Sequence, residues 1–135
     1  MLRGIFLSRK VEIDWFLYGM KTVFLEAWEQ FTSFLSTEER KDLLNSYYAR
    51  LTGPDQKQQL EAAIRWSLYE GACSSLLPNY ETITTEEQKQ HALALARIEA
   101  HYFRNEVVKP ENSLIKKVDK KRCVACWNVV FGFDI

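Results

Sequence analysis

The chain of 135 residues has no excess charge of either sign, because 18 lysines and arginines balance 18 aspartates and glutamates. A protein that binds nucleic acid or an anionic membrane through its charge carries a basic surface, and this composition gives no such signal. The sequence also lacks an apolar run of the roughly 18 residues that a membrane-spanning helix needs. We therefore expect no nucleic-acid partner and no membrane partner.

Cysteine is scarce as well. Three cysteines, an odd number without a regular spacing, favour a reducing compartment over a secreted disulfide scaffold. The N-terminal stretch MLRGIFLSRK is briefly apolar, but no small-residue cleavage site follows it, so we interpret it as structure rather than as a signal peptide. These features predict a cytoplasmic protein.

What the chain has is apolar and aromatic residues, at 47% and 13% of the sequence, enough for one domain with a sizeable core. Apolar residues recur at helical spacing, and two strings, Ser36 to Glu39 and Thr84 to Glu87, have the form of capping boxes that begin helices. Gly19 and Gly71 are expected to end the first and fourth helices. The predicted helices cover about residues 8–18, 24–35, 36–51, 55–70 and 84–104.

A short apolar segment near each end of the chain predicts a strand, over residues 2–7 and about 123–133. Two short strands do not form a stable sheet alone. The pattern is therefore typical of a piece of a larger sheet with helices inserted between its strands. The predicted fold class is mainly α with a short strand at each terminus, divided into segments 1–7, 8–121 and 122–135.

One predicted helix carries a carboxylate in an almost wholly apolar stretch, from His91 to Phe103. At helical spacing Leu95, Glu99 and Phe103 share one face. A helix that is apolar nearly all round is normally buried, and a buried carboxylate is costly unless a cation or several donors meet it. Glu99 is therefore either paired inside the protein or available to a cationic ligand.

Glu70 raises the same question at the predicted end of the preceding helix. A carboxylate there faces the negative end of the helix dipole, and a positive partner would offset that cost. One interpretation is an ion pair with Arg65, Arg97 or a nearby lysine; the other is a ligand site. Because Glu70 and Glu99 lie on successive helices, their side chains can converge.

The remaining candidates for chemistry are weaker. Cys123-Val-Ala-Cys126 is a C-x-x-C pair, but a zinc site needs a second pair and a redox pair would begin a helix rather than enter a strand, so we interpret it as two buried cysteines. Cys73 has no nucleophile motif around it, and His101 is interpreted as structural. We predict no metal site and no cofactor. Taken individually, five aromatic residues are interpreted as core: Phe6, Trp15, Phe16, Trp28 and Phe103.

Several strings together resemble one family. They are Leu2-Arg-Gly-Ile-Phe6, Glu12-Ile-Asp-Trp-Phe16, Phe24-Leu-Glu-Ala-Trp28, Tyr48-Ala-Arg-Leu-Thr-Gly53, Ala63-Ile-Arg-Trp-Ser-Leu-Tyr-Glu-Gly71 and Ala94-Leu-Ala-Arg-Ile-Glu-Ala-His-Tyr-Phe103. Their order and spacing resemble proline iminopeptidase (prolyl aminopeptidase), a serine peptidase of the α/β-hydrolase fold. The resemblance extends from Leu2 to about Asp134.

The resemblance implies that the helices form the cap of the hydrolase, which binds the N-terminal proline of a peptide, and that segments 1–7 and 122–135 are strands of its sheet. In this family, acidic groups of the cap hold the charged imino nitrogen and aromatic rings surround the pyrrolidine. Carried over by motif, the acidic groups are Glu70 and Glu99. The aromatic positions are Phe103, Phe6 and Phe16, the last standing where the family often has tyrosine.

The chain also departs from the family. It contains neither the G-x-S-x-G string of the serine nucleophile nor the matching catalytic histidine. Gly132-Phe-Asp134 approximates the string of the triad acid, so Asp134 is a candidate for that role. We expect the chain to be inactive alone, as a gene remnant or as one part of a split enzyme completed by complementing hydrolase fragments.

Two other classes of function stay open. One is a non-catalytic helical interaction module that self-associates and has no affinity for proline. The other is a metal or redox protein built on the C-x-x-C pair.

Overall fold

The computed structural model describes residues 9–74 and 82–105, and every structural statement below concerns these residues. They form the α-helices α1 (Arg9–Asp14), α2 (Leu25–Ser33), α3 (Leu43–Thr52), α4 (Gln56–Cys73) and α5 (Glu86–Arg104). All the regular structure in these ranges is helical, which confirms the mainly α prediction. The two predicted strands lie outside the described residues. In the same ranges, no helix has the length and apolar character needed to cross a membrane.

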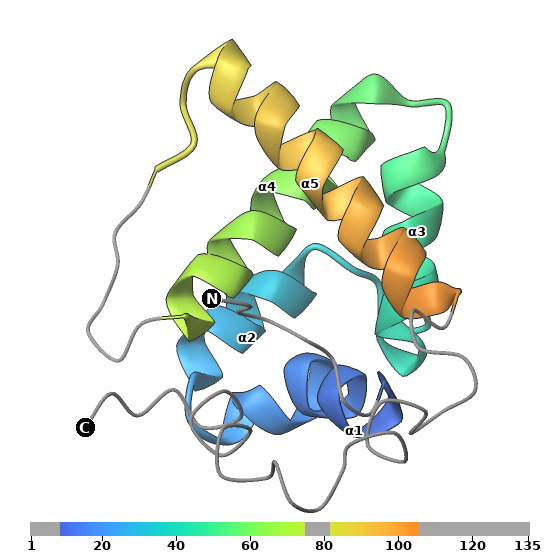
Figure 1. Cartoon of the computed structure of the whole chain (residues 1–135), viewed down its shortest axis with the longest axis vertical. Helices are drawn as coiled ribbons and strands as arrows, with labels where there is room; N and C mark the ends of the chain where they lie inside the picture. The colour runs from blue at the N-terminus through green and yellow to red at the C-terminus, as the bar shows by residue number, and fades with distance from the viewer. Residues whose placement is uncertain (1–8, 75–81, 106–135) are drawn as a thin grey trace, which may run out of the picture.

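The helices pack as a bundle in which α4 is central. Helix α4 packs against α2, α3 and α5, and α3 also packs against α5, as Figure 1 shows. α1 and the turns that follow it lie at the end of the bundle near α2. This arrangement places the C-terminal half of α4 beside α5, which is where the two candidate glutamates lie.

Aromatic rings from three helices form the centre of the core. Phe31 of α2 is stacked between Tyr47 of α3, at 4.3 Å between ring centroids, and Tyr69 of α4, at 4.4 Å. The Tyr47 hydroxyl donates to the carbonyl of Phe31 (2.6 Å), and the Tyr69 hydroxyl donates to that of Phe16 (2.7 Å). These bonds satisfy the polar ends of rings that are otherwise buried among apolar atoms.

The first helix does not end at Gly19, contrary to the prediction. After α1 the chain continues through a π-helical turn (Trp15–Gly19) and a 3₁₀ turn (Met20–Thr22). Gly19 keeps helical backbone angles, and a Cβ atom there would collide with the ring of Trp15. Gly19 is therefore required by the close approach of Trp15, and Trp15 itself is 52% exposed rather than part of the core.

The Ser36–Glu39 capping box forms but does not begin the long helix. The Glu39 amide donates to Ser36 Oγ (3.3 Å) and the Ser36 amide to Glu39 Oε2 (2.8 Å), and this box opens only a 3₁₀ turn, Glu39–Lys41. Helix α3 begins after Asp42, whose carboxylate accepts from the Asn45 amide (3.2 Å). An aspartate at this position satisfies a free amide of the first helical turn.

The limits of α4 and α5 also differ from the predicted ones by a few residues. Helix α4 continues past Gly71 to Cys73, and the amide and hydroxyl of Ser74 both donate to the carbonyl of Glu70, at 2.9 and 2.8 Å. The capping box of α5 is formed by Thr85 with Gln88, one residue later than predicted. Glu70 therefore lies inside the last turn of α4 and does not end it.

Helix α5 is buried on one face only, although its apolar sequence predicted burial nearly all round. Ala92, Ala96 and Ala100 face the bundle. Leu95, Ile98 and Tyr102 are 38%, 53% and 51% exposed and form an apolar row on the outer face.

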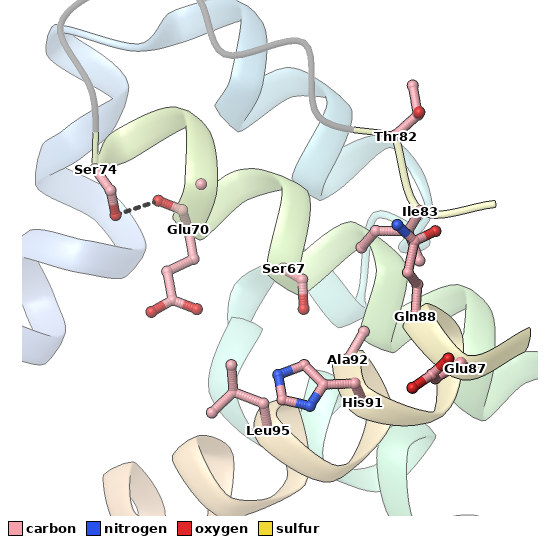
Figure 2. A pocket seen from close by; sticks show the side chains of 11 residues that line it. Ser67, Glu70, Ser74, Thr82, Ile83, Glu87, Gln88, His91, Ala92 and Leu95 are labelled. Atoms are coloured by element: carbon pink, nitrogen blue, oxygen red, sulfur yellow. Dashed lines mark hydrogen bonds between the residues drawn. The ribbon is translucent and has the colours of Figure 1, made fainter. Parts of the chain in front are cut away.

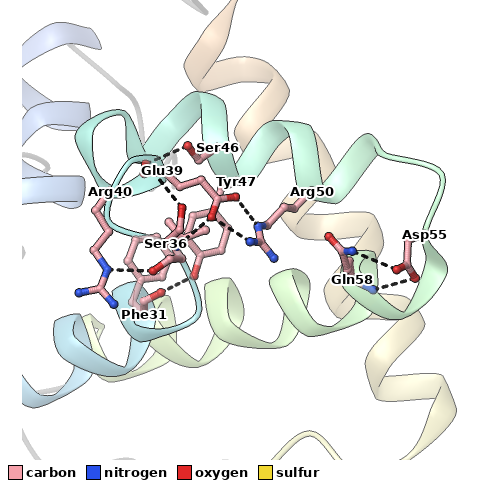
Figure 3. A network of polar contacts seen from close by, with 10 residues as sticks. Phe31, Ser36, Glu39, Arg40, Ser46, Tyr47, Arg50, Asp55 and Gln58 are labelled. Atoms are coloured by element: carbon pink, nitrogen blue, oxygen red, sulfur yellow. Dashed lines mark hydrogen bonds and ion pairs between the residues drawn. The ribbon is translucent and has the colours of Figure 1, made fainter.

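A surface ion pair fixes the turn before α3. Arg50 contacts both carboxylate oxygens of Glu39, at 2.8 and 2.9 Å, while Glu39 also accepts from Ser36 (Figure 3). The hydrogen bonds from Arg50 and Ser36 lower the pKa of Glu39 to about 2. Glu39 therefore loses its carboxyl proton more readily in the folded state than in the unfolded chain, where its pKa has the ordinary value of 4.5.

We expect this pair to make stability depend on pH at the acid end. Its contribution is complete above about pH 4.5 and is lost as the pH falls toward about 2; we expect it to amount to about 1 kcal/mol, because solvent screens both side chains. Urea unfolding of the native chain and of Glu39→Gln across this range measures it. The variant should be less stable near pH 6 and equal to the native chain near pH 2. Equal stability at both ends would contradict the prediction.

Candidate functional site

The two predicted carboxylates meet where α4 and α5 pack together. Glu70 and Glu99 are far apart in the sequence, yet their side chains lie close enough for the charge of Glu99 to raise the pKa of Glu70. Of the site residues predicted from the sequence, these two are brought into direct contact.

Glu99 accepts a hydrogen bond from a residue of the core. The indole Nε1 of Trp66 lies 2.8 Å from Glu99 Oε2. The Trp66 side chain is fully buried, and its ring packs against Phe16 at 5.6 Å and Phe103 at 5.9 Å between centroids. The Glu99 carboxylate therefore has aromatic residues on one side and Glu70 on the other.

The arginines suggested as partners of these glutamates bind elsewhere. Arg65 donates to the carbonyl of Gln30 (3.2 Å), and Arg97 donates to that of Leu51 (2.8 Å). Within the described part of the chain, the ion pairs are Lys41–Glu38, Arg50–Glu39 and Lys89–Glu86. Within that part, the two carboxyl groups face each other without a cation.

This arrangement brings the titration of Glu70 close to neutral pH. Burial raises the pKa of Glu70 to about 7, and the negative charge of Glu99 and the hydrogen bond between the two side chains act in the same direction. Paired carboxyl groups that cannot both ionise easily share a proton in this way.

Glu70 also lines a pocket of about 790 Å³ between the C-terminal part of α4, the start of α5 and residues 82–83. Figure 2 shows its lining side chains. The hydroxyl of Ser67 is buried there, and no described residue forms a hydrogen bond with it. The pocket is lined by Ser67, Glu70, Gly71, Ser74, Thr82, Ile83, Glu87, Gln88, His91, Ala92 and Leu95.

The predicted aromatic residues Phe16 and Phe103 do not line this pocket. The rings of Phe16 and Phe103 are in edge-on contact at 5.7 Å between centroids, and Phe103 is only 6% exposed. Neither residue, nor Glu99, is among those that line the pocket of Glu70. Phe6 and Asp134, like the C-x-x-C pair, lie outside the described residues.

Sequence reasoning did not identify Trp66 as a partner of Glu99. Trp66, Glu70 and Cys73 follow one another at i, i+4 and i+7, so the shared face of α4 could have been recognised, but the contact with α5 could not. Cys73 is no candidate nucleophile, because burial raises the pKa of its thiol, which lies in hydrogen-bond contact with Tyr69. His101 is exposed and contacts the side chain of Asn105.

The known proteins similar to this chain are all proline iminopeptidases in the comparisons below, although no protein-family model matches the chain. A proline iminopeptidase of Xylella fastidiosa is 39% identical over 122 residues, which are 89% of this chain and 39% of that protein. One of Xanthomonas citri is 43% identical over 106 residues, which are 78% of this chain and 34% of the relative. One of Arabidopsis thaliana is 39% identical across the whole chain, which covers 36% of its length.

These relatives are aminopeptidases, and the chain is homologous to a part of them. More narrowly, it is related to one stretch of proline iminopeptidase, and it spans little more than a third of the length of the curated relatives that it matches.

Proposed function

We propose that this chain is the proline-binding part of a proline iminopeptidase, in which Glu70 and Glu99 hold the positively charged nitrogen of an N-terminal proline. The observation that carries the proposal is the pair itself: two neighbouring carboxyl groups, one of which raises the pKa of the other, with no cationic partner in the described ranges. Such a pair is costly in a folded protein, and carboxyl groups with a raised pKa of this kind are concentrated at functional sites.

The chemistry of a prolyl terminus suits this pair. A secondary ammonium has two N–H groups and one positive charge, and two adjacent carboxyl groups offer several acceptor oxygens. The attraction is strengthened because Glu70 is partly buried and Trp66 keeps water from one side of Glu99. The rigid pyrrolidine loses little conformational entropy when it binds.

The pocket beside Glu70 supports a ligand of this size. Its volume of about 790 Å³ lies in the range of small-molecule sites, about 300–1,000 Å³. Ala92, Leu95 and Ile83 give it apolar walls for a hydrocarbon ring. We propose that Phe16 and Phe103 shield the carboxyl pair from water on the opposite side, and that Phe6 adds to this aromatic surface.

We further propose that residues 8–121 are the helical cap of an α/β-hydrolase, with segments 1–7 and 122–135 as strands of its sheet and Asp134 as its triad acid. The helical structure of the described residues supports this proposal. Because the 135 residues contain no G-x-S-x-G string, we propose that they bind a prolyl terminus without hydrolysing it and that complementing hydrolase fragments would supply the reaction.

Titration with L-prolinamide, followed by NMR of the ¹⁵N-labelled chain, tests the binding proposal. We expect shifts confined to residues around Glu70 and Glu99. Replacing Glu99 by glutamine should weaken binding about 10- to 100-fold, because it removes a charge-assisted hydrogen bond of about 1.5–3 kcal/mol. Unchanged affinity in this variant, or flat spectra for the native chain, would refute the proposal.

Two controls separate this result from a general effect of charge. Glu61→Gln removes an exposed carboxylate on α4 and should leave the affinity unchanged. N-acetyl-L-prolinamide, which has the ring but no charge, should not bind.

A separate assay tests the absence of hydrolysis. The chain should not release the chromophore from a prolyl chromogenic amide; turnover that is lost when serine is chemically blocked would contradict the proposal.

A self-associating interaction module is the second candidate. The exposed apolar row on α5, formed by Leu95, Ile98 and Tyr102, favours it, because such rows often mark contacts between proteins. This candidate predicts no response of Glu70 or Glu99 to L-prolinamide, so the same titration distinguishes the two.

A further inference from the structure

We propose that Trp66 is a positioning residue that gives the two carboxyl groups different roles: Glu99 keeps the negative charge, and Glu70 carries a proton that leaves when a cationic amine binds. This inference rests on the proposed function, since it describes how the same pair would take up a prolyl terminus.

The hydrogen bonds around Glu99 support this division. The indole N–H of Trp66 is a donor only, so Glu99 Oε2 is its acceptor, at 2.8 Å. Glu70 lies one helical turn after Trp66, and burial together with the neighbouring charge of Glu99 raises the pKa of Glu70, so that Glu70 is the group that carries a proton below about pH 7. A donor that points at Glu99 favours the charged form of Glu99 and leaves the shared proton with Glu70.

The orientation of the indole is fixed before any ligand arrives. Trp66 is fully buried, and its ring contacts those of Phe16, Phe31, Tyr47 and Phe103, at 5.5–5.9 Å between centroids. A ring held on so many sides cannot rotate its N–H away from Glu99 without repacking the core. The donor is therefore preorganised for the charged form of its acceptor.

The other titratable groups near Glu70 do not take over the role of Trp66 as the donor to Glu99. On α5, Glu87 and His91 line the same pocket and are exposed. On α4, the Tyr69 hydroxyl donates to the carbonyl of Phe16, and the Cys73 thiol contacts Tyr69. No lysine or arginine is among the residues that line the pocket. Within residues 9–74 and 82–105, the ion pairs therefore leave the charge of this pair unmatched.

Binding of the amine then replaces the proton on Glu70 by an ammonium group. The O–H bond of Glu70 breaks, its proton passes to the solvent, and the resulting carboxylate accepts an N–H of the incoming ammonium, which keeps its charge. With a pKa of about 7 for Glu70, binding below this pH competes with the proton. L-prolinamide should therefore bind about tenfold more weakly near pH 6 than near pH 8.

Calorimetry and NMR on the full chain test the inference together. Titration with L-prolinamide near pH 6 in two buffers of different ionisation enthalpy should show about one proton released; near pH 8.5 this release should give way to proton uptake, because Glu70 is already ionised and part of the free amine is neutral. Without ligand, the indole ¹H–¹⁵N signal of Trp66 should shift with a midpoint near pH 7. Trp28 is an internal reference, because its indole donates to the carbonyl of Leu17 (2.8 Å), which does not titrate.

Two variants separate positioning from a purely structural role. Trp66→Phe keeps a ring but removes the N–H, so part of the proton should pass to Glu99: in ¹³C NMR the Glu70 carboxyl signal should lose part of its change around its midpoint, and the Glu99 carboxyl signal should gain it. Trp28→Phe removes an equivalent indole bond and should leave both signals unchanged. If Trp66→Phe does not fold, the Trp66 indole signal of the native chain remains the deciding measurement.

The outcomes distinguish this inference from the proposed function. A native chain that binds L-prolinamide with the same affinity near pH 6 and pH 8, or whose Trp66 signal is constant over this range, overturns the inference and leaves the proposed function standing. Absence of binding at every pH, with the Trp66 signal still titrating, overturns the proposed function and the amine-coupled step, and retains only the division of charge.

Discussion

Replacing Phe31 by alanine is expected to destabilise the folded chain by about 3–5 kcal/mol, the upper range for a single substitution in a protein core. Phe31 is fully buried and is stacked between Tyr47 and Tyr69, with Trp66 edge-on at 5.9 Å. Alanine would leave a cavity where α2, α3 and α4 meet, and the three rings would lose their common neighbour. Because domains are stable by only about 5–15 kcal/mol, the variant should unfold at much lower urea concentration.

Urea unfolding followed by far-ultraviolet circular dichroism measures this effect. Leu25→Ala, also on α2, is the matched control: Leu25 is 55% exposed, so its loss should change the stability by no more than about 0.5 kcal/mol. A cost below about 1 kcal/mol for Phe31→Ala would mean that the aromatic stack does not hold the three helices together.

The positions of the helices could be predicted from the sequence, because apolar stripes and capping residues act over one or two turns. The stripe over residues 24–35 corresponds to α2, Leu25–Ser33, and the predicted helix 55–70 corresponds to α4. The glycines misled the prediction because a glycine ends a helix only where its backbone leaves the helical conformation, as that of Gly53 does after α3. Gly19 instead makes room for the Trp15 ring, and Gly71 lies inside α4.

The site could be predicted only in part, because local sequence patterns do not encode contacts between helices. That Glu70 and Glu99 lie on successive helices follows from the sequence, and their contact is a consequence of the packing of α4 on α5. The hydrogen bond from Trp66 joins residues on different helices and depends on the relative position of these helices, which no local pattern encodes. The apolar sequence of α5 likewise could not indicate that Ile98 would be exposed.

Glu70→Gln should stabilise the fold and weaken ligand binding, and these opposite changes make it the sharpest test of the site. The raised pKa of Glu70 means that the folded state holds this proton more tightly than the unfolded chain does, where the pKa is 4.5. Stability therefore falls as the pH rises from about 4.5 to about 7, and the whole penalty is present above that range. Glutamine has no proton to lose and avoids this penalty.

We expect Glu70→Gln to be about 1–2 kcal/mol more stable than the native chain near pH 8 and almost equal near pH 4.5, since partial exposure of the site reduces the full effect. The same variant should bind L-prolinamide at least about tenfold more weakly near pH 8, because a charged acceptor is lost. Glu39→Gln is the contrasting control, because that carboxylate is paired with Arg50 and its loss should lower stability without changing binding.

A carboxyl group that served only the fold would behave in the opposite way. Its removal would cost stability, as it should for Glu39, and would leave the affinity for the amine unchanged. Among the described residues Glu70 has a partly buried carboxyl neighbour in place of a cation, so the folded chain retains a group that destabilises it at neutral pH. Such destabilising groups accumulate where a protein binds a ligand or performs chemistry. If Glu70→Gln proved less stable than the native chain near pH 8, the pair would be a structural element and the assignment of the proline nitrogen to it would be wrong.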